Sequence, residues 1–565
     1  MRTLHNKLDS PFLSSNKRQL IILLITYISL VTIFSFANRY FINPDGVSYM
    51  RLAGYIAEGN FQQSVSGHWS PLISWCLAPF MLFGIEGVTA ARIVLSLSGL
   101  VLLLGSWLLA KRFNLVYPIN FVALLITALL IVSWSKGISP DLLMTAFLIC
   151  YLYGVTDPNI LTKKKLAFSC GVFAGLAYLS KHYALPFFLI HFPLIVVLRG
   201  YFYRDASRIL NKKVFTTLFI GLITFLVIAS PLIISYSVKY NRLTIGTAGI
   251  HAHAAVGPDV KITKARFRGL RQPKSYAINT WEYPIYQDNL EDFKTWSPFE
   301  NKKYFKHQVK VALSNTNLIY KFFVNNYFII GILSICFLPF AFFIKRMGRE
   351  KRFLYGWVII TIILYCSGYI MVYLPFDSGK RYFYIIYLIV LLLSFNFIQE
   401  IIKNVRTEQT VNLSNIRNLK VYIVLLAVLS FSLSPTIDFY HSVKKITDKQ
   451  SNIYKRIADR LSSVEFYEPY AIVGSGSAKF MGLYVAYYSK KKFLGRPNST
   501  DIEGITKEVK AAGAKSIIVL GSMKILENLK NDEKYRHIIK LKKGELGWDA
   551  ERNEYIEEIN VFYVN

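Results

Sequence analysis

The chain has 565 residues, of which 53% are hydrophobic, and a formal charge of +32 at pH 7. Its mean hydropathy of +0.35 and its repeated apolar runs of nearly twenty residues exclude a soluble multidomain enzyme and predict a polytopic membrane protein. The basic excess does not indicate nucleic-acid binding, because lysine and arginine concentrate in the cytoplasmic loops of membrane proteins.

Eleven apolar segments predict about eleven transmembrane helices. They cover residues 20–37, 91–110, 118–134, 142–155, 166–180, 184–198, 214–236, 322–344, 353–373, 383–401 and 420–434. The first run lacks a small-residue cleavage site and predicts an uncleaved signal anchor. All five cysteines lie in apolar runs, which favours small core hydrophobes over disulfides or zinc ligands.

Charge predicts the orientation of the helices. With the N-terminus in the cytoplasm, the basic stretches 2–18, 199–213 and 345–352 all lie inside, as the positive-inside rule requires. This orientation predicts a first outward loop at about 38–90 and a long outward loop at about 237–321. We therefore predict a transmembrane domain over 1–434 and an outward-facing domain over 435–565.

The last 130 residues have the pattern of a small soluble α/β domain. Two stretches, "YAIVGSG" from Tyr470 and "KSIIVLGS" from Lys515, predict buried strands, and "NVFYVN" predicts a final strand. Between them, "TDIEGITKEVKAAGA" predicts an amphipathic helix that ends at a glycine.

An acidic residue follows the first span closely, in "FINPDGVSY". Asp45 should lie near the outer membrane surface, where a lipid head group would be. Its simplest role is to accept amide hydrogen bonds at the start of an amphipathic helix. The segment "GHWSPLISWCLAPFMLFG" follows, aromatic, interrupted by prolines and too short to span, and predicts a helix in the membrane plane.

These two features resemble the glycosyltransferase C superfamily, particularly family 39, which includes protein O-mannosyltransferase-like and aminoarabinose-transferase-like enzymes. Asp45 matches the catalytic acid of the first outward loop, and His68–Gly84 is similar to the in-plane segment that follows it. The protein O-mannosyltransferases usually carry an Asp-Glu pair, whereas this chain has Asp45-Gly46. That difference leaves the donor and the acceptor open.

Further charged residues lie at outward helix ends. Asp141, in "KGISPDLLMTAFLI", matches the superfamily's second acid, although it could simply start a helix; alternatively it could orient the acceptor, help to bind a metal or position Lys136. Lys181, in "GLAYLSKHYALPFF", could contact a phosphate or snorkel to the interface. In "YLPFDSGKRYFY", the resemblance implies that Arg381, ahead of Lys380, meets the donor phosphate.

The long outward loop contributes two histidines, in "GIHAHAAVGPDV". His251 and His253 have no matching ligands in the loop, which favours acceptor contacts or solvated side chains over a metal site. The loop continues with the aromatic and acidic stretch 281–300, typical of a folded flap. We predict a substrate vestibule lined by Tyr49, His68, Trp69, His182, His251 and His253.

The resemblance implies a donor with one sugar on a polyprenyl phosphate, and the residue types suit that donor. Asp45 would act as general base in an inverting transfer to a hydroxyl of a glycan, lipid or protein. Basic side chains would stabilise the leaving phosphate, so the pattern requires no cofactor and does not indicate a divalent cation. The alternatives are a lipid-linked oligosaccharide ligase or polymerase, and a membrane transporter or flippase.

Overall fold

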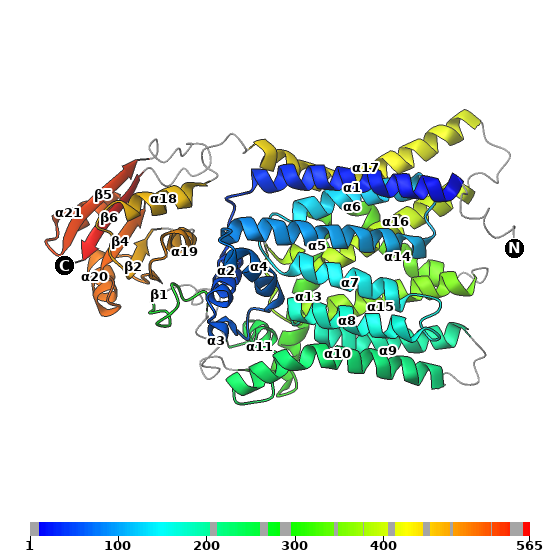
Figure 1. The fold of residues 1–565 in the computed structure, drawn as a ribbon, viewed down its shortest axis with the longest axis horizontal. Helices are drawn as coiled ribbons and strands as arrows, with labels where there is room; N and C mark the ends of the chain where they lie inside the picture. Colours follow the sequence, from blue (N-terminus) through cyan, green and yellow to red (C-terminus); the bar gives the residue numbers. More distant parts are fainter. Residues whose placement is uncertain are drawn as a thin grey trace.

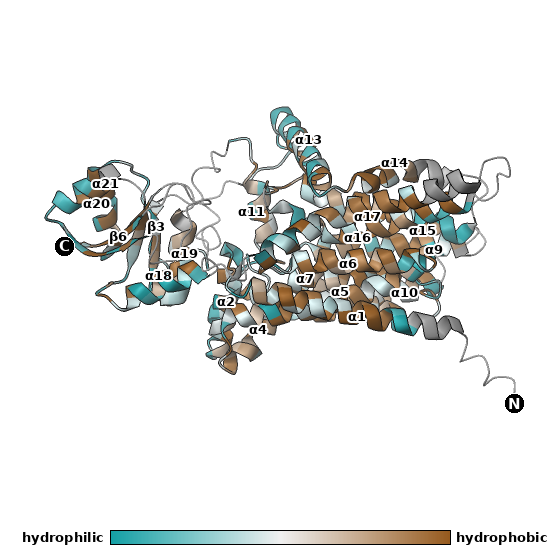
Figure 2. Cartoon of the chain, turned by 90° about the horizontal axis from the view of Figure 1, so that it is seen from above, coloured by the Kyte–Doolittle hydropathy of each residue, from teal (hydrophilic) through white to brown (hydrophobic). Residues whose placement is uncertain are grey.

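The computed structural model describes residues 11–203, 212–259, 269–282, 295–343, 348–376, 378–404, 413–444, 452–474, 478–520, 523–542 and 558–564. Long helices lie side by side in one bundle, and a six-stranded sheet lies beyond one end of it (Figure 1). The bundle is hydrophobic along most of its length, and the sheet region is more hydrophilic (Figure 2). This arrangement confirms a polytopic α-helical membrane protein.

Each of the eleven predicted segments coincides with a helix. The helices are α1 (Pro11–Ala37), α5 (Gly87–Ala110), α6 (Ile119–Trp134), α7 (Asp141–Val155), α8 (Lys164–Ser180), α9 (Ala184–Tyr203), α10 (Lys212–Lys239), α14 (Ile329–Phe343), α15 (Arg349–Ile370), α16 (Tyr384–Asn404) and α17 (Leu413–Lys444). Among the described residues, seven helices are long and apolar enough to cross a membrane, while α6, α7 and α14 are apolar but shorter. The count of eleven spans therefore stays a prediction.

Several predicted boundaries differ from the structure, and two segments differ most in what they predict. The segment predicted at 322–344 divides into the end of α13 (Lys302–Asn325) and α14. The charged residues of α13 make it hydrophilic beside the apolar bundle (Figure 2), so hydropathy alone did not reveal this helix. At the other boundary, α17 continues to Lys444 instead of ending at 434.

The first outward loop folds as three short helices at the end of the bundle that faces the sheet (Figure 1). These are α2 (Pro44–Ala57), α3 (Phe61–Ser64) and α4 (Leu72–Leu82), and α2 packs against α4. Because α4 has only 11 residues, it is too short to cross the bilayer. Trp75 and Phe83 remain 42% and 83% exposed, as expected for an in-plane helix with one face in lipid.

The sheet is built mainly from the C-terminal region. Its strands are β1 (Gly269–Leu270), β2 (Tyr470–Val473), β3 (Phe493–Arg496), β4 (Ser516–Leu520), β5 (Tyr535–Lys542) and β6 (Glu558–Val564), in the order β1-β3-β2-β4-β6-β5. The parallel pairing of β2 with β3 and β4 requires the crossover helices α19 (Ala478–Ser489) and α20 (Ile502–Ala511). The helices α18 (Ile453–Ser462) and α21 (Met523–Asn531) complete this region. The strands predicted at 470, 515 and 560 coincide with β2, β4 and β6.

Candidate functional site

The start of α2 is tied to the loop between α6 and α7. Pro44 opens the helix and Asp45 lies in its first turn, where the helix dipole favours an acid. Asn43, at the cap position, makes no side-chain cap bond. Instead its amide nitrogen donates to the backbone oxygen of Ile138 at 3.2 Å, and its amide oxygen accepts from the Ile138 N–H at 2.8 Å. These two bonds join the loops that carry Asp45 and Asp141.

Gly46 permits this close approach. A Cβ atom at Gly46 would lie 2.8 Å from the Cβ of Ile138, so a larger side chain would push the two loops apart. This contact gives a physical reason for Asp45-Gly46 where the resembling family has an Asp-Glu pair. From α5, the buried Arg92 donates to the carbonyl oxygens of Phe41, Ser135 and Lys136 at 2.7–2.8 Å and so anchors both loops.

Four charged side chains form one chain of ion pairs at this end of the bundle. Arg381, on the short helix η5 (Gly379–Phe383), donates to the Asp45 carboxylate. Its Nε lies 3.3 Å from a carboxylate oxygen of Asp141, at the start of α7. The other Asp141 oxygen accepts from the Nζ of Lys181 at 2.5 Å, at the junction of α8 and α9. We call Asp45, Arg381, Asp141 and Lys181 the charge cluster.

The charge cluster is formally neutral and largely withdrawn from solvent. Asp141 is its most buried member, with 2% of its side chain exposed, and the other three are 19–22% exposed. A carboxylate this deep requires cationic partners. Snorkelling of Lys181 is a wrong prediction, because its ammonium group turns towards Asp141. Asp141 does start a helix, as expected, but its carboxylate also holds two cations.

Aromatic rings surround the charge cluster. The Lys181 ammonium lies 3.4 Å from the ring centroid of Tyr382 and 5.8 Å from that of Tyr369, which adds cation–π attraction. Tyr49 is buried against Trp69, with ring centroids 5.2 Å apart. Burial, followed by the charges of Asp45 and Asp141, raises the pKa of Tyr49 well above its ordinary value. The phenol therefore stays protonated beside the charge cluster.

The predicted vestibule histidines do not share one environment. His68 packs edge-on against Trp69 and lies 6.2 Å from His251, measured between ring centroids. His251 is fully buried, so the expectation of a solvated side chain is wrong for it. His253 instead stacks on Trp296, and its Nε2 lies 3.0 Å from the Gln308 amide oxygen. In the described part of the chain, no three His, Cys, Asp or Glu residues gather as metal ligands would.

His182 directly follows Lys181, a member of the charge cluster, in the chain. Its Nε2 is 3.2 Å from the hydroxyl of Tyr236 on α10, and its side chain is buried. Burial lowers the pKa of His182 to about 4. The imidazole is therefore neutral at physiological pH and adds no charge to the site.

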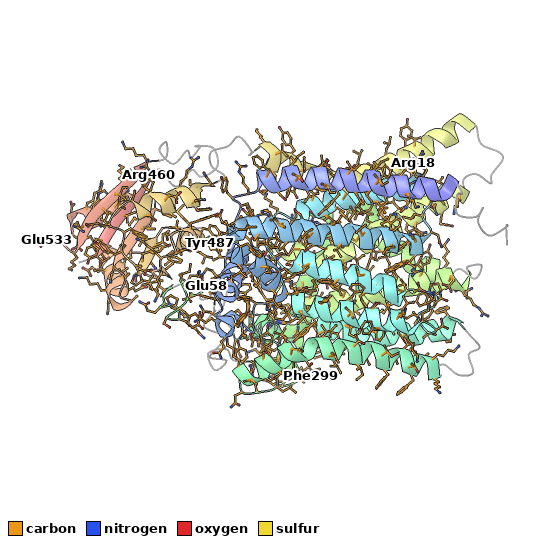
Figure 3. The ribbon with its side chains drawn as sticks, in the orientation of Figure 1. Arg18, Glu58, Phe299, Arg460, Tyr487 and Glu533 are labelled. Carbon is orange, nitrogen blue, oxygen red and sulfur yellow. The ribbon has the colours of Figure 1, made fainter. Side chains whose placement is uncertain are left out.

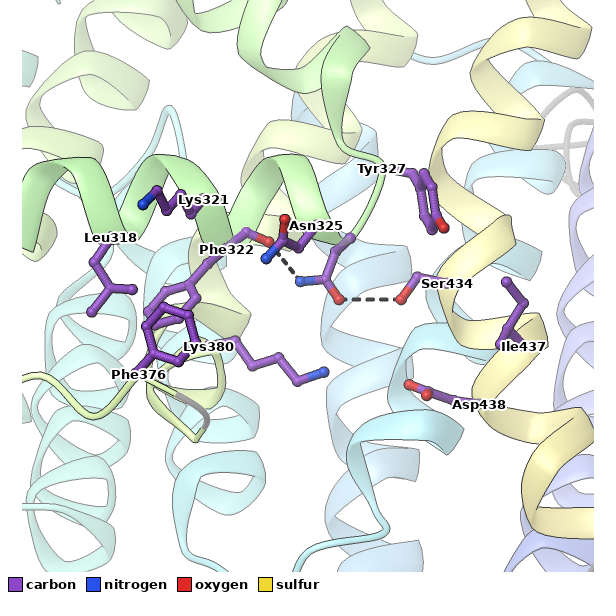
Figure 4. A pocket seen from close by; sticks show the side chains of 11 residues that line it. Leu318, Lys321, Phe322, Asn325, Tyr327, Phe376, Lys380, Ser434, Ile437 and Asp438 are labelled. Atoms are coloured by element: carbon purple, nitrogen blue, oxygen red, sulfur yellow. Dashed lines mark hydrogen bonds between the residues drawn. The ribbon is translucent and has the colours of Figure 1, made fainter. Parts of the chain in front are cut away.

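Lys136 and Lys380 are not members of the charge cluster as defined above. The Nζ of Lys136 is 5.4 Å from the ring centroid of Phe41. Lys380 precedes Arg381 but points into a different pocket, of about 370 Å³, between α13, η5 and α17 (Figure 4). That pocket is lined by Leu318, Lys321, Phe322, Asn325, Asn326, Tyr327, Phe376, Lys380, Ser434, Ile437 and Asp438. Of two consecutive side chains on η5, Arg381 thus joins the charge cluster and Lys380 lines this pocket.

A second buried polar group was not predicted from the sequence. Glu282, in the long outward loop, is fully buried and accepts hydrogen bonds from the Tyr55 hydroxyl at 2.5 Å and the Asn279 amide at 3.0 Å. The Arg51 Nε lies 3.4 Å from the same carboxylate. An isolated glutamate in a loop gives no periodic signal, so only the fold reveals this role. Most of the predicted flap, residues 283–294, lies outside the described residues.

The two acids of the charge cluster should differ in their effect on stability. Asp141→Asn leaves Lys181 and Arg381 without their shared buried carboxylate, which we expect to lower the free energy of unfolding by about 3–5 kcal/mol. Asp45→Asn removes a more exposed partner and should lower it by about 1 kcal/mol or less. Thermal unfolding in detergent measures both variants. Equal losses of stability would contradict the arrangement.

No family model matches the sequence, and no curated protein matches it. Among solved structures, the chain is similar to ArnT from Cupriavidus metallidurans bound to undecaprenyl phosphate, with 13% identity, a TM-score of 0.50, and coverage of 96% of this chain and 97% of that one. It is also similar to the arabinofuranosyltransferase AftD from Mycobacteria, with 9% identity and a TM-score of 0.51. The match to AftD covers 96% of this chain but 41% of AftD. At these identities the similarity shows the fold alone, which this chain shares with ArnT and with part of AftD.

Proposed function

We propose that the chain is an inverting glycosyltransferase that moves a single sugar from a polyprenyl-phosphate donor to an acceptor hydroxyl. The observation that carries the proposal is the charge cluster, which places two acids and two cations together at one end of the bundle. The fold match to ArnT bound to undecaprenyl phosphate supports a polyprenyl-phosphate partner. The match to AftD, an arabinofuranosyltransferase, supports sugar transfer.

The cluster suits an in-line displacement at the anomeric carbon. The acceptor oxygen forms the new glycosidic bond while the bond from the anomeric carbon to the phosphate oxygen breaks, so the configuration inverts. Asp45 takes the proton of the acceptor hydroxyl. The bonding electrons leave with the polyprenyl phosphate, whose developing charge Lys181 and Arg381 stabilise.

The ion pairs also suggest how the site is activated. Arg381 donates to Asp45, so in this state the carboxylate is engaged and less available as a base. The phosphodiester of the donor carries one negative charge and competes with both acids for Arg381 and Lys181, and its negative charge grows as the polyprenyl phosphate leaves. Donor binding would therefore release Asp45 for the acceptor proton. Asp141 would keep the two cations in place.

We place this reaction at the outer face of a bacterial cytoplasmic membrane. The start of α1 lies at one end of the bundle, and α2 with the charge cluster lies at the other (Figure 1). The basic stretches 162–166 and 349–352 lie at the same end of the bundle as the start of α1 and indicate the cytoplasmic side. The C-terminal sheet would then lie outside, next to the charge cluster.

Loss of the base should abolish most of the transfer. We expect Asp45→Asn to lower kcat by about 10²- to 10⁴-fold, because the acceptor proton loses its base. Transfer from polyprenyl-phosphate hexose or pentose in reconstituted vesicles measures the effect. Glu58→Gln is the matched control, since Glu58 is an exposed acid at the other end of α2 (Figure 3), and this change should leave kcat unchanged.

Two outcomes would contradict the proposal in different ways. Full activity of Asp45→Asn would show that Asp45 is not the base, although the protein would still be a glycosyltransferase. Lipid scrambling or solute uptake by the unaltered protein, with no sugar transfer from any polyprenyl-phosphate donor, would indicate a transporter.

The role of Lys181 predicts a pH dependence. Burial lowers the pKa of Lys181 to about 8 from its ordinary 10.5, although Asp141 opposes the shift. The ammonium is charged below about pH 8 and loses its proton above it, so kcat should fall as the pH rises through 8. Lys181→Arg keeps the charge, and we expect its activity to persist at least one pH unit higher. Identical alkaline limbs of the two pH profiles would exclude Lys181 as the phosphate partner.

A further inference from the structure

Part of the long outward loop belongs to the C-terminal sheet. Residues 269–282, which we call the strap, begin with β1, which pairs antiparallel with β3 through Gly269–Arg496 and Leu270–Gly495. The N–H of Arg271 donates to the Leu494 oxygen at 2.9 Å, and the Ile278 oxygen accepts from the N–H of Phe493 at 2.8 Å. The strap thus covers an edge of the sheet that would otherwise be unpaired.

The other end of the strap binds α2, the helix that begins with Asp45. The Ser48 hydroxyl donates to the Trp281 oxygen at 3.0 Å, and Glu282 receives Tyr55 and Arg51 as described above. Ser48, Arg51 and Tyr55 lie three and four residues apart and therefore share one face of α2. The strap holds this face along two turns of the helix, directly after Asp45.

The C-terminal region also contacts α2 directly through α19. The Tyr487 hydroxyl donates to the sulfur of Met50 at 3.5 Å, at the boundary seen in Figure 3. Phe480 packs edge-on against Trp281 of the strap, with ring centroids 6.3 Å apart. Strap and α19 together enclose the start of α2.

We infer that the strap positions Asp45: it fixes α2 against the C-terminal sheet, so that this sheet is a working part of the transfer site and Glu282 is a positioning residue. The inference rests on the proposed function. Its physical basis is that Glu282 is fully buried at the end of the strap and contacts Tyr55 and Arg51 of α2 as well as Asn279 of the strap. A displacement of a catalytic group by 1 Å can cost about 100-fold in rate.

This inference selects among the roles open to the C-terminal region. A sheet that only captured the acceptor would need no buried carboxylate joined to α2. In contrast, a positioning role requires a continuous path of hydrogen bonds from the sheet to the helix. The path runs from β3 through β1, then along the strap to Glu282 and Tyr55.

The first test combines Glu282→Ala with Asp45→Asn. We expect Glu282→Ala alone to lower kcat by 10- to 100-fold with little change in KM for the donor, because Asp45 is misplaced while the cations remain. In the Asp45→Asn background the same change should have no further effect on kcat. Additive losses would overturn the positioning role. The matched control, Glu465→Ala, removes a carboxylate from an exposed ion pair with Arg536 in the same region and should be silent.

The second test changes the sheet end of the strap and leaves Glu282 in place. A Cβ at Gly495 would lie 2.8 Å from the Gly269 oxygen, so Gly495→Ala should push β1 off β3. Gly513→Ala is the control, since Gly513 also has a positive φ, of +69°, but a Cβ there meets no atom closer than 3.8 Å. We expect kcat to fall at least 5-fold for Gly495→Ala relative to Gly513→Ala. Equal activity of the two variants would overturn the path through the sheet.

A measurement independent of activity separates this inference from the proposed function. Hydrogen–deuterium exchange over residues 44–57 should accelerate in Glu282→Ala and in Gly495→Ala but not in the two control variants. Unchanged exchange would overturn the strap even if sugar transfer is demonstrated. Faster exchange in a protein that transfers no sugar would leave the strap intact and contradict the proposed function alone.

Discussion

The site depends on the pairing of charges that are buried together. Asp141 has almost no contact with water, and its two oxygens face Lys181 and Arg381. Removing such a carboxylate from water is costly unless cations replace the lost hydration, so the residue can be buried only where those cations meet it. Lys181 and Arg381 together carry one positive charge more than Asp141 neutralises, and the carboxylate of Asp45 balances that charge. Each member of the charge cluster therefore makes the burial of the next one tolerable.

The four members come from separate parts of the chain, and uncharged contacts bring them into register. The amide of Asn43 joins the first outward loop to Ile138, and Arg92 collects the carbonyl oxygens of both loops. Because these partners are backbone groups, they define where the loops run independently of the side chains that follow. Asp45 and Asp141 lie in the first turns of α2 and α7, where the helix dipoles favour acidic side chains.

The C-terminal region extends the same principle outward. A buried glutamate beyond the bundle, Glu282, joins the long outward loop to α2, and a short strand of the loop completes the sheet. Hydrogen bonds to a carboxylate are stronger than those between neutral groups. The structure thus connects the helical bundle to the α/β sheet through the polar contacts of the strap, the edge strand β1 and the contact of α19 with α2.

The sequence by itself determined the elements whose signal is local. Apolar runs revealed the helices of the bundle, short apolar runs revealed β2, β4 and β6, and charges at helix ends singled out Asp45, Asp141, Lys181 and Arg381. The sequence also suggested Lys136 and Lys380. It could not separate Lys380 from Arg381, because spacing along the chain says little about the direction of a side chain on a short helix such as η5. Only the tertiary structure decided that Lys380 faces another pocket, that His251 is buried, and that Glu282 joins the strap to α2. These facts depend on contacts between residues far apart in the chain, and no periodicity or composition records such contacts.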